Sequence, residues 1–258
     1  MHDGIVRDGI KPGDVVVVTG AGGGFGRAFC KRFASAGAKV AAWEINPQAG
    51  AETVSQVKAA GGEARLFEVD LADAGQIAAA VEQTLAAFGT PYLIVNNASI
   101  YPRATVIDMK VEDWERTLRV NITAPFLIVR AFGPHMLKQK RGVVINIASG
   151  RAVEGAPRGA NYACSKAAIL SLTKSLALEW APQNVRVNAI IPGVSMTAQP
   201  LENTTPQELA ERGRKEIPLG RVGYPEDMAG LAAFLASSDA AYMTGQAVAM
   251  NGGRVLVP

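Results

Sequence analysis

Short apolar runs alternate with longer amphipathic segments along the chain. The runs are rich in β-branched residues and lack polar alternation, which is typical of strands buried on both faces. The intervening segments repeat apolar residues at helical spacing and are rich in alanine. Strands are therefore expected at Val15–Val18, Lys39–Trp43, Ala64–Val69, Tyr92–Val95, Val143–Ile147 and Val185–Ile190, and helices from near Gly26 and over Pro47–Ala60, Ala74–Phe88, Val111–Met136 and Asn161–Trp180.

This alternation predicts an α/β fold, with a parallel sheet covered by helices on both sides. Right-handed crossovers then give a doubly wound, Rossmann-like three-layer sandwich. No repeat or linker divides the chain, so residues 1–258 are expected to form one dinucleotide-binding and catalytic domain, with residues 1–13 as an N-terminal extension. Residues 192–223 are polar and contain four prolines. A long insertion after a strand predicts a substrate lid, although an ordinary surface connection would have a similar composition.

Composition narrows the function classes. The chain has 258 residues, of which 48% are hydrophobic, and its formal charge of +3 is spread without a basic run. That distribution argues against nucleic acid as a partner and favours a small molecule. Cys30 and Cys164 show no metal-ligand spacing and are expected to be reduced thiols, with no metal bound. Neither a secretory leader in residues 1–13 nor a membrane span is predicted, so a cytoplasmic protein is expected.

The first predicted strand runs into a glycine-rich turn, TGAGGGFG at residues 19–26. The usual GxGxxG pattern is not matched literally, and the glycines that fit a cofactor turn are Gly20, Gly24 and Gly26. Glycines permit a tight turn and a close approach of the backbone to a pyrophosphate, and the following helix offers free N–H groups. Because the turn lies between a strand and a helix, it predicts dinucleotide binding by these glycines and Phe25.

Polar and small residues follow the next three predicted strands. Glu44 ends the second strand, where a carboxylate accepts hydrogen bonds from ribose hydroxyls and repels a 2′-phosphate, so NAD is favoured over NADP. Asp70 and Leu71 close the third strand near the expected adenine position. Asn97 and Ala98 close the fourth, where small residues let a cofactor lie against the strand ends. Together these residues trace the rim of a ligand site.

Tyr162 and Lys166 stand four residues apart, on one face of a predicted helix. A free phenol titrates near about 10, too high for efficient proton transfer at neutral pH. A neighbouring ammonium, with a positive nicotinamide ring, would favour the phenolate and make Tyr162 a usable acid–base group. Ser149 ends the fifth strand and could hold the substrate oxygen.

These motifs together resemble the short-chain dehydrogenase/reductase family. The resemblance rests on TGAGGGFG, NNAS, VNITAPF, Ser149, YACSK, IIPGVSMT and YMTGQAVAMNGG, in order from about Val15 to Gly253. It implies a seven-stranded parallel sheet, hydride transfer with a nicotinamide cofactor and assembly as a homotetramer. The implied catalytic tetrad is Asn121, Ser149, Tyr162 and Lys166.

The resemblance also implies individual roles. Lys166 would bind the nicotinamide ribose, and Asn121 would help to hold a water that links Lys166 to solvent. Residues that would flank the nicotinamide and phosphates are Pro192, Gly193, Val194 and Thr197. Two positions depart from the family pattern: Ser99 stands where glycine is more common, and Asn251 where aspartate is frequent. Ser99 could alter the loop beside the cofactor, whereas Asn251 is expected to affect C-terminal packing.

Substrate identity stays open at this stage. Pocket residues are expected after the fourth strand, after the fifth strand and in the lid, namely Ile100, Tyr101, Arg103, Arg151, Val153, Glu154, Pro157, Met196, Pro200 and Leu201. Arg103, Arg151 and Arg158 suggest an anionic substrate, although solvated loop arginines would look the same. The apolar members favour a secondary alcohol or ketone.

Three functions are consistent with these residues. The first is an NAD-dependent alcohol dehydrogenase or ketone reductase. The second is a 3-oxoacyl-(acyl-carrier-protein) reductase, for which Lys138, Lys140 and Arg141 offer some positive charge. The third is a non-catalytic cofactor-binding sensor, which the presence of both Tyr162 and Lys166 disfavours.

Overall fold

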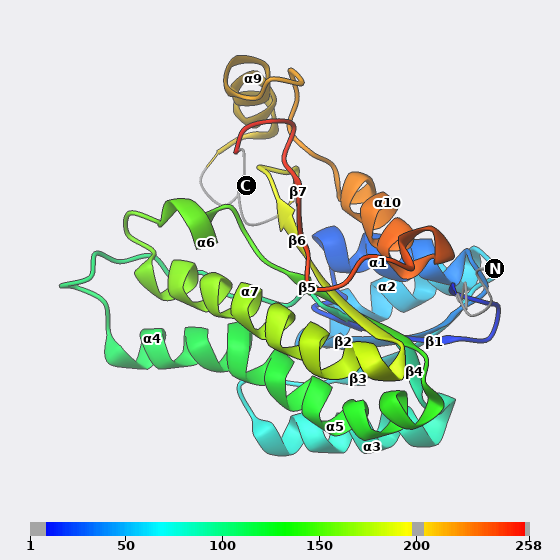
Figure 1. The fold of residues 1–258 in the computed structure, drawn as a ribbon. Helices are drawn as coiled ribbons and strands as arrows, with labels where there is room; N and C mark the ends of the chain where they lie inside the picture. The colour runs from blue at the N-terminus through cyan, green and yellow to red at the C-terminus, as the bar shows by residue number, and fades with distance from the viewer. Residues whose placement is uncertain (1–8, 198–203, 256–258) are drawn as a thin grey trace.

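The computed structural model describes residues 9–197 and 204–255. Its centre is a seven-stranded parallel sheet with the strand order β3-β2-β1-β4-β5-β6-β7 (Figure 1). The doubly wound fold expected from the sequence is therefore confirmed. The strands are β1 (Val15–Thr19), β2 (Lys39–Glu44), β3 (Glu63–Glu68), β4 (Pro91–Asn96), β5 (Gly142–Ile147), β6 (Val185–Pro192) and β7 (Ala247–Met250).

Helices cover both faces of the sheet. One face is packed by α1 (Gly24–Ala34), α2 (Pro47–Ala59) and α10 (Pro225–Ala236), and the other by α3 (Ala74–Phe88), α5 (Ala124–Gln139) and α7 (Ala160–Trp180) (Figure 1). The two apolar clusters on either side of the sheet meet the alternate faces of the same strands, as a buried parallel sheet requires. The remaining helical segments are α4 (Val111–Leu118), α6 (Arg151–Glu154), α9 (Pro206–Glu216), the π-helical turn η1 (Arg119–Thr123) and the 3₁₀ turns η2 (Ala181–Gln183) and η3 (Ser238–Ala240).

Burial differs between central and edge strands. Every residue of β1, β4 and β5 is buried, as their apolar runs predict. The edge strand β3 is less buried: only Ala64 and Phe67 are buried, and Leu66 is half-buried. Ala64 belongs to the apolar cluster on one face of the sheet and Phe67 to the cluster on the other, so both faces of this strand are covered, but only in part.

The long helix expected over Val111–Met136 is interrupted. Helix α4 ends at Leu118, η1 makes one π turn over Arg119–Thr123, and α5 then begins at Ala124. A π turn adds a residue to the helical repeat and is frequent at functional sites. Here it contains Asn121, a member of the predicted tetrad.

Other expectations concern membranes and cysteines. Within the described part of the chain, no helix combines the length and apolar character that crossing a membrane would need. Cys30 is buried and Cys164 exposed, and both are free thiols. Burial raises the pKa of the Cys30 thiol to about 12, so it stays protonated.

Candidate active site

A cavity of about 1080 Å³ lies beyond the carboxyl ends of the strands. It opens where the chain, having built β2 and β3 on one side of β1, crosses to β4 on the other, the usual ligand position in such sheets. The predicted residues that line it are Gly20, Gly24, Phe25, Glu44, Asp70, Leu71, Asn97, Ala98, Ser149, Tyr162, Lys166, Pro192, Gly193, Val194 and Thr197.

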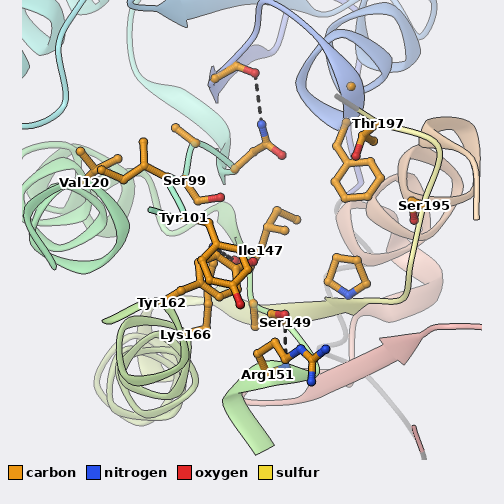
Figure 2. A pocket seen from close by; sticks show the side chains of 18 of the residues that line it. Ser99, Tyr101, Val120, Ile147, Ser149, Arg151, Tyr162, Lys166, Ser195 and Thr197 are labelled. Carbon is orange, nitrogen blue, oxygen red and sulfur yellow. Dashed lines mark hydrogen bonds between the residues drawn. The ribbon is translucent and has the colours of Figure 1, made fainter. Parts of the chain in front are cut away.

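Three of the four predicted catalytic side chains meet at one end of this cavity (Figure 2). Tyr162 and Lys166 lie on α7, and the Lys166 ammonium is 5.5 Å from the centre of the Tyr162 ring. Lys166 Nζ donates a hydrogen bond of 2.7 Å to the carbonyl oxygen of Ile147 at the end of β5. Ser149 follows that strand, and its Oγ accepts a hydrogen bond from the backbone N–H of Arg151 at 3.2 Å. The Arg151 bond does not use the Ser149 proton, which can be donated to Tyr162 in the chain alone or to a bound ligand.

A second tyrosine covers the catalytic one. The rings of Tyr101 and Tyr162 stack with their centres 4.2 Å apart and an interplanar angle of 19°. Gly159, just before α7, makes room for this stack, because a Cβ there would lie 2.4 Å from the Tyr101 ring. The Arg103 guanidinium carbon lies 4.8 Å from the centre of the Tyr101 ring. The sequence had placed Tyr101 in the pocket but contained no sign of the stack.

Burial dominates the titration of the catalytic pair. It raises the pKa of Tyr162, a hydrogen bond from Ser149 acts in the opposite direction, and the charges of Tyr101 and Arg151 add smaller opposing effects. Burial also lowers the pKa of Lys166 to about 7. Lys166 is not among the groups that shift the Tyr162 pKa in the chain alone, so the lowering expected from its ammonium together with a nicotinamide ring stays a prediction.

The fourth tetrad member, Asn121, is not among the described residues that line the cavity. Its Oδ1 accepts from the N–H of Ile100 at 2.9 Å, and its Nδ2 donates to the carbonyl of Ile100 and to Ser165 Oγ, each at 3.0 Å. The buried carboxamide thus ties the segment after β4 to helix α7. Its membership of a catalytic tetrad, and the water that it was expected to help hold, stay predictions.

The glycine turn forms the cradle that the sequence predicts. Gly20 has φ +64° and a Cβ there would lie 2.9 Å from Ala98, while Gly24 has φ +48°. Both conformations favour glycine. Gly26 does not reach the cavity surface; a Cβ there would lie 1.9 Å from the carbonyl oxygen of Gly20, so this glycine permits close packing of the turn on α1. The cradle therefore fits a pyrophosphate held by backbone N–H groups.

The carboxylate of Glu44 is fixed at the far end of the cavity. It accepts backbone N–H groups from Gly22 at 2.8 Å and from Ile45 and Asn46 at 3.0 Å each. Three bonds leave part of the carboxylate's capacity of about four acceptor positions for a ligand hydroxyl. A Cβ on Gly22 would lie 2.9 Å from the Glu44 carboxyl group, so glycine at that position is needed for this arrangement.

Two neighbouring groups at this end are already paired. Arg27 forms a bidentate ion pair with Glu52 at 2.8 and 2.9 Å and also donates to the carbonyl of Gly22. Asp70 is bridged to Arg116 at 3.2 Å. Neither Arg27 nor Arg116 therefore presents an unpaired guanidinium beside Glu44.

Sequence reasoning about the substrate end was only partly right. Ile100, Tyr101, Arg103, Arg151, Glu154 and Pro157 line the cavity. Val153 and Met196 are not among the described lining residues: Val153 is exposed, and Met196 packs against the cluster of Leu209, Ile217 and Val222. Pro200 and Leu201 lie outside the described residues.

Several lining residues were missed. The main ones are Leu209 and Arg212 on α9, and Asn251, Arg254 and Val255 near the C-terminus. Helix α9 opens with a capping box between Thr205 and Glu208, a signal that the sequence does carry. Asn251 donates to the carbonyl of Val255 at 2.7 Å, as expected of a residue that shapes the C-terminal turn, and it also faces the cavity.

Comparisons with known proteins agree with this geometry. A family model described as Enoyl-(Acyl carrier protein) reductase matches residues 20–254. The chain is 36% identical over 244 residues to 3-oxoacyl-[acyl-carrier-protein] reductase FabG of Thermotoga maritima, covering 95% of this chain and 98% of that protein. It is 38% identical over 248 residues to 3beta-hydroxysteroid dehydrogenase 1 of Eggerthella lenta, covering 95% of each.

A solved structure is similar in sequence and in shape. It is that of a putative NAD(P) dependent gluconate 5-dehydrogenase from Beutenbergia cavernae with bound NADP at low occupancy. The TM-score is 0.88 at 39% identity, over 94% of this chain and 97% of that one. On the family match, the relatives and the shared fold, the chain belongs to the short-chain dehydrogenase/reductase family of nicotinamide-dependent oxidoreductases.

Proposed function

We propose that this protein transfers a hydride between NAD and a secondary alcohol or ketone, with Tyr162 as the general acid and base. The observation that carries the proposal is the convergence of Ser149, Tyr162 and Lys166 at one end of a cavity whose other end holds Glu44. The glycine cradle between these ends has the conformation that a dinucleotide needs. When bound, the nicotinamide supplies the hydride donor or acceptor.

The chain's own groups divide the remaining work. The Ser149 hydroxyl, oriented by the Arg151 N–H, donates a hydrogen bond to the substrate oxygen. Tyr162 gives its proton to that oxygen in the reduction and takes it back in the oxidation. Because burial raises the Tyr162 pKa, the phenol is held protonated in the chain alone, which suits the reductive direction. Lys166, anchored on the Ile147 carbonyl, contributes its charge or a hydrogen bond at the ribose side.

Two contacts support NAD over NADP. The Glu44 side chain is held by three N–H groups at the position expected for the ribose hydroxyls, where a carboxylate would repel a 2′-phosphate. Arg27, the cation that could offset this repulsion, is paired with Glu52 on two N–H groups. The similar gluconate 5-dehydrogenase is named for either cofactor, so the preference rests on these residues alone.

A carrier-bound 3-oxoacyl substrate is the second candidate, supported by the relative that is named for that reaction. The geometry gives it little help. The basic residues Lys138, Lys140 and Arg141 precede β5, whereas Ser149 follows it. They therefore lie at the opposite end of this strand, roughly 20 Å from Ser149. Arg141 is moreover paired with Asp14 at 2.7 Å. A carrier docked on these residues would not face the cavity.

The proposal is tested by steady-state assays of the purified protein with NADH and NADPH against ketones, sugars, keto acids and an acyl-carrier-linked 3-oxoacyl group. The expected result is reduction of a free carbonyl with NADH preferred. Turnover of the carrier-linked substrate alone would favour the second candidate. Tight NADH binding without turnover of any class would instead favour a non-catalytic sensor. Light scattering of the same sample tests the predicted homotetramer.

A further inference from the structure

Charge is divided unevenly between the two ends of the cavity. Around the glycine turn and the ends of β2 and β3, the described lining residues carry two carboxylates, Glu44 and Asp70, and one arginine, Arg116; Asp113 lines the cavity from α4. The substrate end carries four arginines, Arg103, Arg151, Arg212 and Arg254, and one carboxylate, Glu154. A cavity wall of one sign concentrates ligands of the opposite charge. The substrate end is therefore suited to an anion.

The four arginines differ in how far they are already paired. Arg212 Nε bonds the Glu216 carboxylate at 2.9 Å, and Arg254 also lies close enough to Glu216 to lower the pKa of that carboxyl. Arg151 uses only Nη1, which approaches the Glu154 carboxylate at 3.7 Å and donates a long hydrogen bond of 3.5 Å to the carbonyl of Gly155. Arg103 has no carboxylate partner within the described part of the chain. Arg103 and Arg151 thus have donors to offer to a ligand.

Stacking fixes where Arg103 offers them. Its guanidinium lies over Tyr101 at 4.8 Å, and Tyr101 lies over Tyr162 at 4.2 Å. Stacking occupies the face of a guanidinium and leaves the N–H groups at its edge, which match a carboxylate in a bidentate manner. The arginine is therefore held one ring away from the proton-transfer group, although it is exposed to solvent.

Arg151 approaches the same tyrosine from the other strand end. It stands two residues after Ser149 and its charge acts on Tyr162. Figure 2 shows its side chain next to Ser149, across from the tyrosine stack. Arg103 and Arg151 thus approach the proton-transfer tyrosine from different elements, the first through Tyr101 after β4 and the second beside Ser149 after β5.

Resting on the proposed function, we propose that the substrate is a hydroxy or keto acid, and that Arg103 and Arg151 bind its carboxylate. Tyr101 then serves two purposes, since its ring contacts both Tyr162 and Arg103. Arg158, the third arginine that the sequence singled out, is not among the described lining residues and has no part in this site.

The test compares acids with their uncharged amides. Threonate, ribonate and gluconate are each paired with the primary amide of the same carbon skeleton, and kcat/KM is measured with NAD for wild type, Arg103→Gln, Arg151→Gln and Arg158→Gln. Because a hydrogen bond to a charged group contributes about 1.5–3 kcal/mol, the ratio of acid to amide is expected to fall roughly 10- to 100-fold in each of the first two variants. The fall should lie mainly in KM, and Arg158→Gln should leave the ratio unchanged.

Calorimetry of each acid and amide, titrated into the protein with NADH, gives a readout without turnover. Acids should bind at least about tenfold more tightly than amides, and Arg103→Gln should abolish the difference. Equal binding of acid and amide, or no binding by either, overturns the proposal. Tighter binding of a sugar phosphate than of any acid, in the same titration, would also overturn the proposal, in favour of a phosphate ligand. Tyr162-dependent reduction of neutral ketones in the same preparation would show that the hydride-transfer proposal survives such a failure.

Discussion

The two ends of the cavity are built on different principles. The cofactor end is made of backbone: positive-φ glycines, and a carboxylate held by three N–H groups. The substrate end is made of side chains from loops and short helices far apart in the sequence, such as Tyr101, Arg151 and Arg212. Backbone geometry admits few residue types and so constrains the sequence, whereas a side-chain wall can be rebuilt residue by residue. We call the cofactor end, which is built from backbone, the fixed end, and it suits a cofactor that stays the same. We call the substrate end, which is built from side chains, the adaptable end, and it suits a substrate that differs between relatives.

The largest expected effect lies where the two ends meet. Tyr162→Phe removes the proton-transferring hydroxyl and leaves the ring that stacks on Tyr101, so kcat should fall about 10²- to 10⁴-fold while NADH affinity changes little. Stopped-flow and steady-state assays measure the first quantity, and fluorescence titration the second. Cys164→Ser, an exposed change on the same helix, is the control. Retention of near-normal kcat would mean that Tyr162 is not the acid–base group.

A smaller change is expected when the fixed end loses its charge. Glu44→Gln keeps a side-chain oxygen as an acceptor but no longer repels a 2′-phosphate, so the ratio of kcat/KM with NADH to that with NADPH should fall about 10- to 100-fold. Glu68→Gln is a matched control, because Glu68 is exposed and stands next to Glu44 in the register of the neighbouring strand β3. An unchanged ratio in Glu44→Gln would remove the basis for NAD preference.

The adaptable end can be disturbed without touching a substrate contact. Gly159→Ala places a methyl group against Tyr101 while its own φ of −161° suits any residue. Displacement of the stack should lower kcat roughly tenfold, since a misplacement of about 1 Å can cost up to 10²-fold. Gly230→Ala, where a Cβ meets nothing within 4 Å, is the control. If the effect acts through the stack, Gly159→Ala should add little in a Tyr101→Leu background; full additivity would contradict this.

The last expected effect is on stability, not on rate, and concerns Lys166. Its pKa is lowered to about 7 in the folded chain from an ordinary 10.5, so the unfolded chain binds more protons between these values. The free energy of unfolding therefore rises with pH between about 7 and 10.5. Below about pH 7 Lys166 is charged in both states, and the full cost of burying its charge destabilises the fold. Lys166→Met should be most stabilising relative to wild type near pH 6 and lose that advantage towards pH 10.

Differential scanning calorimetry without cofactor measures the difference in Tm between Lys166→Met and wild type. In a chain of this size each kcal/mol of stability shifts Tm by about 2–4 °C. Lys174→Met, an exposed change on the same helix, controls for general pH effects. A difference in Tm that stays constant from pH 6 to pH 10 would show that Lys166 is not destabilised by burial.

The predictability of the site follows the same division. Gly20, Gly24 and Glu44 could be placed from the sequence because a strand, a turn and a strand end locate them directly. Tyr162 and Lys166 could be paired because helical spacing puts them on one face. Arg212 and Arg254 could not, since their approach to the cavity depends on how α9 and the C-terminal turn fold back over it. Val153 was misplaced for a related reason. It lies on the four-residue helix α6, and the sequence pattern does not say which side of so short a helix faces the cavity.

The π turn η1 makes the number of residues, and not only their identity, important between α4 and α5. A π turn holds one residue more than an α-helix does. Deleting a residue next to Asn121 within Arg119–Thr123 would let the two helices join as one regular α-helix that keeps its outer faces, while the residues of the former turn would shift by one position, about 100° of rotation. Asn121 would then turn away from Ile100 and Ser165, although its codon remained intact. Sequence comparisons that score this segment by substitutions alone would overlook such a lesion, whereas a gap placed here would mark loss of the arrangement.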